Sequence, residues 1–286
     1  RRTHKPEVSG SIPLPATKYL LIMLLKKIKS KVNSFLKIFG YKISKVNRNI
    51  SIAEESDFEA KTRKEVKKYT EAGDFSIFNF FRACKYLFDN NIEGDFVEAG
   101  VYQGGMLILF AKILEKNPHE SSRLIYGYDT FSGMTEPSEF DVKYKHKNEF
   151  NYTAERIINE KIKNNTLDQW VNCSLENVKK NLVLNLKSLK NIKLVVGDVR
   201  KTLLDINNIP EKISLLRIDT DFFDSTKVVL EKMYSKVEIG GVIILDDYGS
   251  WSGSKRAADD FFKEKNLKPF LFVSNESERI FIKTTN

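Results

Sequence analysis

Five short apolar runs that alternate with helix-like segments are the feature of this sequence that most constrains its fold. The runs span residues 95–99, 124–128, 192–196, 213–218 and 242–245. Strands that alternate with helices are typical of a parallel sheet covered by helices on both faces. The nearly continuous apolar character of the runs agrees with burial on both sides. The sequence therefore predicts a doubly wound α/β domain.

Further helix-like segments and a terminal hairpin complete the expected domain. The helical segments span residues 75–88, 106–114, 154–162, 175–182, 225–234 and 254–263. Residues 270–273 and 279–283 flank a short polar turn, which predicts an antiparallel pair of strands. The sheet should thus be mostly parallel with an antiparallel last strand. Residues 132–153 lack periodicity and are long for a loop, so we expect a lid or an acceptor loop there.

The net charge of +9 is concentrated at the beginning of the chain. Residues 1–48 carry twelve Lys and Arg and one acid, which leaves 35 basic and 37 acidic side chains for the other 238 residues. A nearly neutral globular part argues against nucleic-acid binding by the fold. The basic stretch is suited instead to an acidic surface or an anionic lipid.

The first 48 residues are predicted to form a basic extension that precedes the domain. Residues 1–22 are interpreted as a leader added for expression or as a flexible tail, with Met23 as the native start. Apolar residues recur at helical spacing over 24–39, between lysines. This predicts an amphipathic helix that docks on its own domain or on a partner subunit, with a membrane surface as the alternative. No run of about 20 apolar residues is present, so a membrane span is not expected.

Each of the five predicted parallel strands ends in an acid, and these acids predict where a ligand binds. They are Glu98, Asp129, Asp198, Asp219 and Asp246. In open α/β sheets, ligands bind beyond the carboxyl ends of the strands, so the five side chains should line one site.

The turn after the first strand favours S-adenosylmethionine as the ligand. Its glycines permit close backbone approach, but G-x-G-x-x-G is absent, which disfavours a dinucleotide. An acid at the start of the turn suits a cationic, hydroxyl-bearing ligand. Asp129 is placed to accept from both ribose hydroxyls, and Asp198 from the adenine amino group. The residues predicted to bind the cofactor are Glu98, Gly100, Tyr102, Gly104, Asp129, Thr130, Phe131, Ser132, Asp198 and Val199.

A metal site is predicted where the fourth and fifth strands end. Asp219 and Asp221 follow one strand, and Asp246 and Asp247 follow the next. Close carboxylates raise each other's pKa, so a metal or a basic group has to neutralise them. All-oxygen ligands indicate Mg²⁺, with Mn²⁺ or Ca²⁺ as alternatives. The competing interpretation is that Asp246 and Asp247 cap the following turn, and a lysine or arginine in this corner would contradict the metal prediction.

Several blocks of the chain resemble the macrocin O-methyltransferase (TylF-like) family of S-adenosylmethionine-dependent enzymes. The blocks are FVEAGVYQG at 96–104, YDTFSGM at 128–134, DTDFFDST at 219–226, GGVIILDDYG at 240–249 and GSKRAAD at 253–259. The resemblance covers about residues 75–285. It implies a class I methyltransferase fold, Rossmann-like, over residues 49–286. It also implies Mg²⁺ held by Asp219, Asp246 and Asp247, and methyl transfer to a hydroxyl, often on a sugar.

The expected function is therefore S-adenosylmethionine- and Mg²⁺-dependent O-methylation of a sugar or a glycosylated small molecule. Asp219 is the candidate catalytic base, and Asp221 is the second candidate. The alternatives are a metal-dependent catechol-type O-methyltransferase, a dinucleotide-binding oxidoreductase and a non-catalytic binding module. We expect a homo-oligomer with a small-molecule or glycan acceptor. Cys84 and Cys173 form no C-x-x-C, which favours a reduced, cytoplasmic setting.

Overall fold

The computed structural model describes residues 52–144, 152–164 and 171–285 of the chain. The basic extension predicted for residues 1–48, the helix predicted for 24–39 and part of the 132–153 stretch lie outside the described residues. Within the described residues, none of the helices has the length and apolar character that crossing a membrane requires.

A seven-stranded sheet forms the centre of the domain, in the order β5-β2-β1-β6-β7-β9-β8. Its strands are β1 (Asp95–Ala99), β2 (Ile125–Asp129), β5 (Ile192–Val196), β6 (Ile213–Ile218), β7 (Val237–Leu245), β8 (Phe272–Val273) and β9 (Arg279–Ile282). The first five run parallel to one another, and β9 pairs antiparallel with both β7 and β8. The predicted fold class, including the antiparallel last strand, is confirmed.

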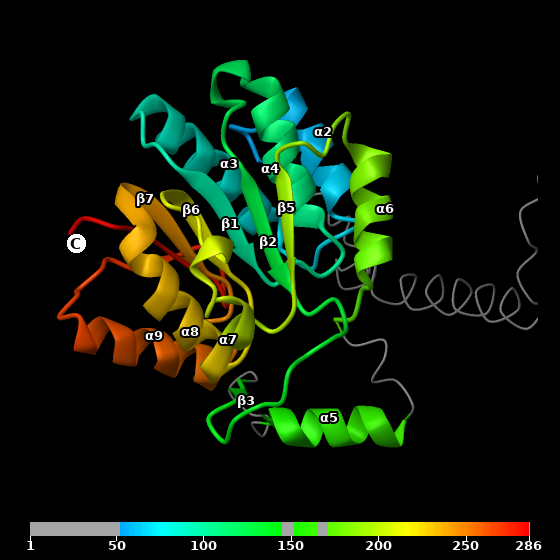
Figure 1. Cartoon of the computed structure of the whole chain (residues 1–286), viewed down its shortest axis with the longest axis vertical. Helices are drawn as coiled ribbons and strands as arrows, with labels where there is room; N and C mark the ends of the chain where they lie inside the picture. Colours follow the sequence, from blue (N-terminus) through cyan, green and yellow to red (C-terminus); the bar gives the residue numbers. More distant parts are fainter. Residues whose placement is uncertain (1–51, 145–151, 165–170, 286) are drawn as a thin grey trace, which may run out of the picture. The chain divides into compact units, whose positions relative to one another are not determined.

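Helices cover both faces of this sheet (Figure 1). On one face lie α3 (Asp74–Asp89), α4 (Gly105–Lys116) and α6 (Leu175–Asn185), and α2 (Asp57–Val66) packs on α3 and α4. On the other face lie α7 (Val199–Thr202), α8 (Phe223–Met233) and α9 (Ser252–Glu264). Short 3₁₀ turns occur at η1 (Pro118–Glu120), η3 (Ile206–Asn208) and η4 (Tyr234–Lys236).

Alternation along the strands divides the core between the two faces. In β6, Leu215 joins the cluster under α3 and α4, and Leu216 joins the cluster under α8 and α9. Successive strand side chains point to opposite faces, so each parallel strand is apolar on both sides. Arg217 follows in the same alternation and lies on the α3 and α4 face, beside Glu98 of β1 in the register. A buried ion pair is thereby built into the sheet.

The largest difference between the predicted and observed strand boundaries is at the start of β7, while β2, β8 and β9 differ by one or two residues. The structure starts β7 at Val237, five residues before the predicted start at Val242. Gly240 has a φ of 86° inside this strand, and the pairing with β6 shifts register between Ile213 and Leu215. The glycines interrupt the apolar pattern, which is why the sequence shows only the second half of the strand.

The segment expected to form a lid or acceptor loop contains regular structure of its own. Val142–Lys143 (β3) and Tyr152–Thr153 (β4) pair antiparallel, and α5 (Ala154–Lys163) follows them. The Thr153 hydroxyl caps α5 by accepting from the Arg156 N–H at 3.2 Å. Lys143 also bridges to Trp251 at the start of α9, so this small sheet is attached to the helical layer.

Candidate active site

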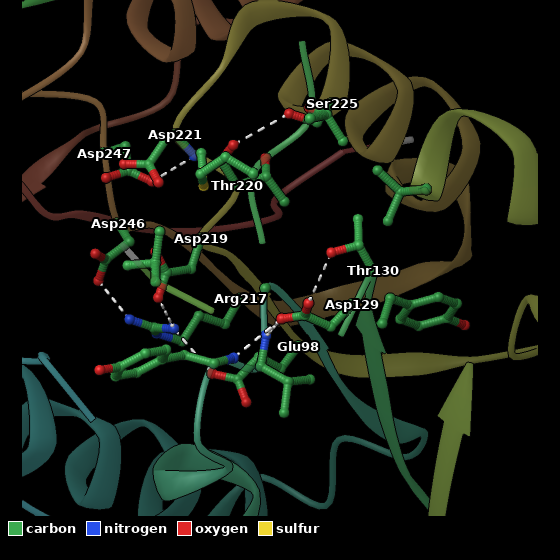
Figure 2. Close-up of a pocket in the computed structure, with 18 of the residues that line it drawn as sticks. Glu98, Asp129, Thr130, Arg217, Asp219, Thr220, Asp221, Ser225, Asp246 and Asp247 are labelled. Atoms are coloured by element: carbon green, nitrogen blue, oxygen red, sulfur yellow. Dashed lines mark hydrogen bonds and ion pairs between the residues drawn. The ribbon is translucent and has the colours of Figure 1, made fainter. Parts of the chain in front are cut away.

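A cavity of about 510 Å³ opens beyond the carboxyl ends of β1, β2, β6 and β7. Most of the residues predicted for the cofactor and the metal line it. These are Glu98, Gly100, Tyr102, Asp129, Thr130, Asp198, Val199, Asp219, Asp246 and Asp247. The topology thus gathers acids that lie up to 149 positions apart in the sequence. Figure 2 shows this convergence from β1, β2, β6 and β7.

Three predicted cofactor residues do not line the cavity. A β-carbon on Gly104 would face Val178 and Leu182 of α6, so this glycine serves helix packing. Phe131 is buried in the core under α4, with a φ of 52°. Ser132 is exposed, and its N–H donates to the Thr130 hydroxyl at 3.1 Å. Direct cofactor contact by these three residues stays a prediction, and the structure gives each of them a local role.

Asp129 organises the turn that follows β1. Its carboxylate accepts the N–H groups of Val101 at 2.7 Å and Tyr102 at 3.0 Å, and also that of Phe131 at 2.8 Å. Tyr102 is held at a φ of 50°, which costs free energy for a bulky residue and recurs at ligand sites. Asp129 therefore shapes the cradle in which it was predicted to hold the ribose.

Asp198 lines the cavity but already has a strong partner. The Arg200 guanidinium donates to both oxygens of its carboxylate at 2.6–3.0 Å, and the Arg200 N–H caps the start of α7 through it at 2.9 Å. Recognition of the adenine amino group by Asp198 stays a prediction, and it would have to share the carboxylate with Arg200.

Arg217 reaches into the predicted metal corner. Its Nη1 donates to Asp219 Oδ2 at 2.6 Å and to Glu98 Oε1 at 2.8 Å, and its Nη2 donates to Asp246 Oδ1 at 2.6 Å. An arginine in this corner counts against the metal predicted from the sequence, because it supplies positive charge to Asp219 and Asp246 itself. It uses one oxygen of Asp219 and one of Asp246, and no described ion pair joins it to Asp247. The corner is therefore only partly neutralised by the protein itself.

The buried acids of this region outnumber the positive charge that Arg217 supplies, and burial and their mutual repulsion raise several of their pKa values. Burial raises the pKa of Glu98 to about 8, although the nearby charge of Arg217 lowers it. Burial and the charges of Asp221 and Asp219 raise the pKa of Asp247 well above its ordinary value. Six acids share this region: Glu98, Asp219, Asp221, Asp246, Asp247 and Glu278. Such shifts mark sites where a cation or a proton completes the charge balance.

Asp221 and Asp247 form the side of the corner away from Arg217 (Figure 2). The Asp221 N–H donates to Asp247 Oδ2 at 2.9 Å, and the Asp221 backbone has a φ of 57°. Oxygens of Asp219, Asp246 and Asp247 all lie within 4.8 Å of one another. Together these contacts fix the three carboxylates as one compact cluster.

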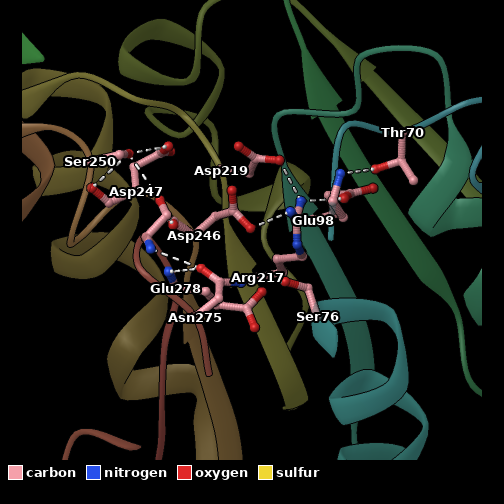
Figure 3. A network of polar contacts seen from close by, with 12 residues as sticks. Thr70, Ser76, Glu98, Arg217, Asp219, Asp246, Asp247, Ser250, Asn275 and Glu278 are labelled. Atoms are coloured by element: carbon pink, nitrogen blue, oxygen red, sulfur yellow. Dashed lines mark hydrogen bonds and ion pairs between the residues drawn. The ribbon is translucent and has the colours of Figure 1, made fainter. Parts of the chain in front are cut away.

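The turn between β8 and β9 supports this cluster from below (Figure 3). The Ser277 hydroxyl donates to the Asp246 carbonyl oxygen at 2.5 Å, and the Gly249 N–H donates to the Ser277 carbonyl at 2.7 Å. Glu278 is buried beside Asp246, and its Oε1 has no hydrogen-bond partner. The end of the chain thus holds the backbone that carries Asp246 and Asp247.

Sequence reasoning missed part of the cavity lining. Residues 70–72, between α2 and α3, also line the cavity. Their backbone can approach the start of α4 because Gly105 has no side chain; a β-carbon on Gly105 would lie 2.7 Å from Tyr69 O. Lys143 also lines it, with its ammonium 5.2 Å from the ring centre of Trp251. The contact of Arg217 with the acids was also missed. The sequence feature that could have predicted it is a charged residue inside an apolar strand, two positions before Asp219.

The fold and the acid-lined cavity at the ends of the central strands define a class I methyltransferase. The profile of the family described as Macrocin-O-methyltransferase (TylF) matches residues 20–275 of the chain. The chain belongs to this family, and it is an S-adenosylmethionine-dependent O-methyltransferase.

Individual relatives agree with this assignment. The chain is 28% identical over 199 residues to demethyldecarbamoylnovobiocin O-methyltransferase of Streptomyces niveus, covering 68% of this chain and 67% of the relative. It is 23% identical over 159 residues to the 8-demethyl-8-(2,3-dimethoxy-alpha-L-rhamnosyl)-tetracenomycin-C 4'-O-methyltransferase of Streptomyces olivaceus, covering 56% of this chain and 54% of the relative. The solved O-methyltransferase NovP shares the fold, with a TM-score of 0.63, 24% identity and coverage of 76% and 83%.

Proposed function

We propose that the protein methylates a hydroxyl of a sugar or a glycosylated small molecule, and that Mg²⁺ held by Asp219, Asp246 and Asp247 assists the reaction. The domain responsible spans residues 49–286. Two similar enzymes are named for novobiocin- and rhamnosyl-tetracenomycin-type acceptors, which supports a glycosylated acceptor. The observation that carries the metal assignment is the set of three carboxylates with oxygens within 4.8 Å of one another.

The donor set fits a hard cation. Carboxylate oxygens are ligands that Mg²⁺ prefers, and one oxygen from each of the three carboxylates lies within 4.8 Å of the others, so together they would hold one ion after side-chain adjustment. Asp247 has no described ion pair, and Asp219 and Asp246 each keep one oxygen that Arg217 does not contact. When bound, Mg²⁺ supplies positive charge that orients acceptor oxygens and stabilises a developing alkoxide.

The residues of this chain would prepare the two reactants in separate parts of the cavity. The turn after β1, shaped by Asp129, cradles the donor, and Glu98 offers a buried Oε2 without a hydrogen-bond partner to a cationic group. Holding the sulfonium methyl group in line with the acceptor oxygen can lower the barrier by about 7–11 kcal/mol. Asp219 lies between the two parts and is the candidate to accept the acceptor's proton, with Asp221 as the second candidate.

Arg217 fits this scheme as a fixed counter-charge. Its side chain is 2% exposed and contacts acids from β1, β6 and the end of β7. It keeps Asp219 and Asp246 oriented before any ligand arrives, because its two Nη atoms contact these residues separately. The arginine and the metal would therefore use different oxygens of the same carboxylates.

A radiolabelled methyl donor tests the proposal directly. Glycosylated small molecules, free glycans, sugar nucleotides and a catechol are incubated with the enzyme, with and without a chelator. We expect label on a sugar hydroxyl, loss of transfer with the chelator, and recovery on adding Mg²⁺. Transfer that resists the chelator would overturn the metal assignment, and transfer to the catechol alone would favour the catechol-type alternative.

A matched pair of variants separates chemistry from binding. Asp219→Asn should abolish turnover, while calorimetry still detects S-adenosylmethionine binding. Asp205→Asn changes an exposed acid that caps η3 and does not line the cavity, so it should behave as wild type. Wild-type rates for Asp219→Asn would remove Asp219 from the mechanism.

A further inference from the structure

Asp141 is a buried acid outside the cavity whose partners link two parts of the proposed acceptor site. Asp141 is only 1% exposed. Its Oδ1 accepts the Phe223 N–H at 2.7 Å, and its Oδ2 accepts the Ser138 N–H at 2.7 Å and the Ser138 hydroxyl at 2.8 Å. The carboxylate thus joins the segment before β3 to the first turn of α8.

The start of α8 depends on this distant carboxylate. The N-cap residue is Phe222, which has no side-chain acceptor, and α8 has no side-chain cap of its own. A free N–H in the first turn of a buried helix needs an acceptor, and a carboxylate there also interacts favourably with the helix dipole. Because Asp221 immediately precedes Phe222, the position of this first turn sets the position of Asp221.

Residues 138–144, here called the strap, depend on the same carboxylate. The strap continues from Asp141 into β3, where the Val142 N–H donates to the Ser252 hydroxyl at 2.9 Å and Tyr144 donates to Ser250 O at 2.8 Å. Lys143 of the strap lines the cavity beside Trp251. The side chain of Asp141 therefore fixes the segment that brings Lys143 to the acceptor side.

The Asp141 carboxylate is tightly packed against the backbone at the start of α9. A β-carbon on Gly253, in the first turn of α9, would lie 1.8 Å from Asp141 Oδ1. The acid consequently occupies the space that a glycine leaves between the starts of α8 and α9. Gly253 has no positive φ, so a substitution there would act on Asp141 through space and without backbone strain.

We propose that Asp141 is a positioning residue that couples the strap carrying Lys143 to the helix start carrying Asp221. The inference rests on the proposed function, because it assigns Asp141 to the acceptor and metal side of that site. The Asp141 carboxylate has no described hydrogen bond to the turn after β1 that cradles the donor. Removing this carboxylate should therefore weaken metal and acceptor binding and leave donor binding intact.

Three variants and a control test the inference. Asp141→Ala removes both sets of contacts, and Gly253→Ala displaces the carboxylate. Asp141→Asn keeps an oxygen for the Phe223 N–H but presents an amide NH₂ group to Ser138. Ser56→Ala removes a comparable cap from α2, where the Ser56 hydroxyl accepts from the Glu59 N–H at 3.3 Å. All four are first checked for folding by circular dichroism.

Binding is measured with Mn²⁺ by electron paramagnetic resonance and with S-adenosylmethionine by calorimetry. Asp141→Ala and Gly253→Ala should weaken Mn²⁺ binding about tenfold, the fold-change that corresponds to the free energy of roughly one helix cap. They should change S-adenosylmethionine binding by less than about twofold. Asp141→Asn should recover most of the Mn²⁺ affinity but raise the KM of any acceptor found in the label screen. Ser56→Ala should change neither affinity.

Hydrogen exchange gives a readout that does not need a metal. Asp141→Ala should speed exchange in peptides over 138–144 and 220–226, and Asp141→Asn only over 138–144. Equal weakening of metal and donor binding, or unchanged exchange over 220–226 in Asp141→Ala, would overturn the inference. If wild-type protein binds no Mn²⁺, the metal assignment fails, and the exchange pattern alone decides the role of Asp141.

Discussion

Gly100 and Asp219 meet through their backbones at the floor of the active site. A β-carbon on Gly100 would lie 1.8 Å from the carbonyl oxygen of Asp219, and Gly100 has a φ of 93°. The Asp219 N–H also donates to Ala99 O at 2.8 Å. The donor turn and the candidate base are therefore positioned by one close contact.

Gly100→Ala should damage both folding and donor binding. The overlap is with backbone atoms, which cannot move aside, and alanine is strained at this φ, so we expect a loss of about 3 kcal/mol or more in unfolding free energy. Chemical denaturation and calorimetry with S-adenosylmethionine measure the two effects. Gly73→Ala is the matched control, since its β-carbon would meet nothing closer than Ser76 Oγ at 3.8 Å. Equal stability of the two variants would contradict the contact.

Replacing Arg217 should leave acids that a divalent cation can partly rescue. Arg217→Met removes the charge between Glu98, Asp219 and Asp246, and losing one partner of a buried ion pair costs about 3–5 kcal/mol. Thermal unfolding with and without MgCl₂ should show a larger Mg²⁺-induced increase in Tm for this variant than for wild type. Arg217→Lys serves as the comparison, because it keeps the charge but cannot contact two acids with separate nitrogens. A Tm of Arg217→Met that does not respond to Mg²⁺ would count against the metal site.

Asp247→Asn should make the metal-free protein more stable. Burial and neighbouring acids raise the pKa of Asp247 well above its ordinary value, so its charge is unfavourable without a cation. The amide oxygen can still accept the Asp221 N–H, which keeps the local geometry. We expect Tm to rise by about 2–4 °C, corresponding to about 1 kcal/mol. The increase in Tm that Mg²⁺ produces in wild type should disappear in this variant; if it persists, Asp247 is not a ligand.

Lys283 should make the unfolding free energy depend on pH in the alkaline range. This lysine is 2% exposed, donates to Tyr234 O at 3.2 Å and Val237 O at 2.8 Å, and has a pKa that burial lowers below 10.5. The unfolded state then binds more protons than the folded state between the lowered pKa and 10.5. Stability relative to Lys283→Met should therefore rise with pH in that window and level off above it. Denaturation of both proteins from pH 8 to 11 measures the difference, and parallel curves would refute the assignment.

The parallel strands and the acids at their ends could be predicted from the sequence because both are local features. Short apolar runs specify buried strands, and the acid that follows each run needs no tertiary information. The convergence of Asp219 and Asp246 then follows from the topology of a parallel sheet. This explains why most predicted site residues line one cavity, although their contacts with ligands stay predictions.

The parts that could not be predicted depend on contacts between distant segments. Nothing near Asp141 in the sequence indicates that it caps α8, 82 positions later. The approach of Thr70 to the cavity depends on the absence of a side chain at Gly105. The sequence shows that Arg217 is a charged residue within an apolar strand. It does not show that Arg217 pairs with Asp246 and not with Asp247, because that depends on the register of the strands.

The hydrogen bonds from the β8–β9 turn to Asp246 make the acid pair depend on a hairpin that contributes none of the residues assigned to the donor. Ser277 and Gly249 secure the backbone of the pair, 31 positions before Ser277 in the case of Asp246. Loosening this hairpin would therefore disturb the acid pair first and leave the turn after β1 in place.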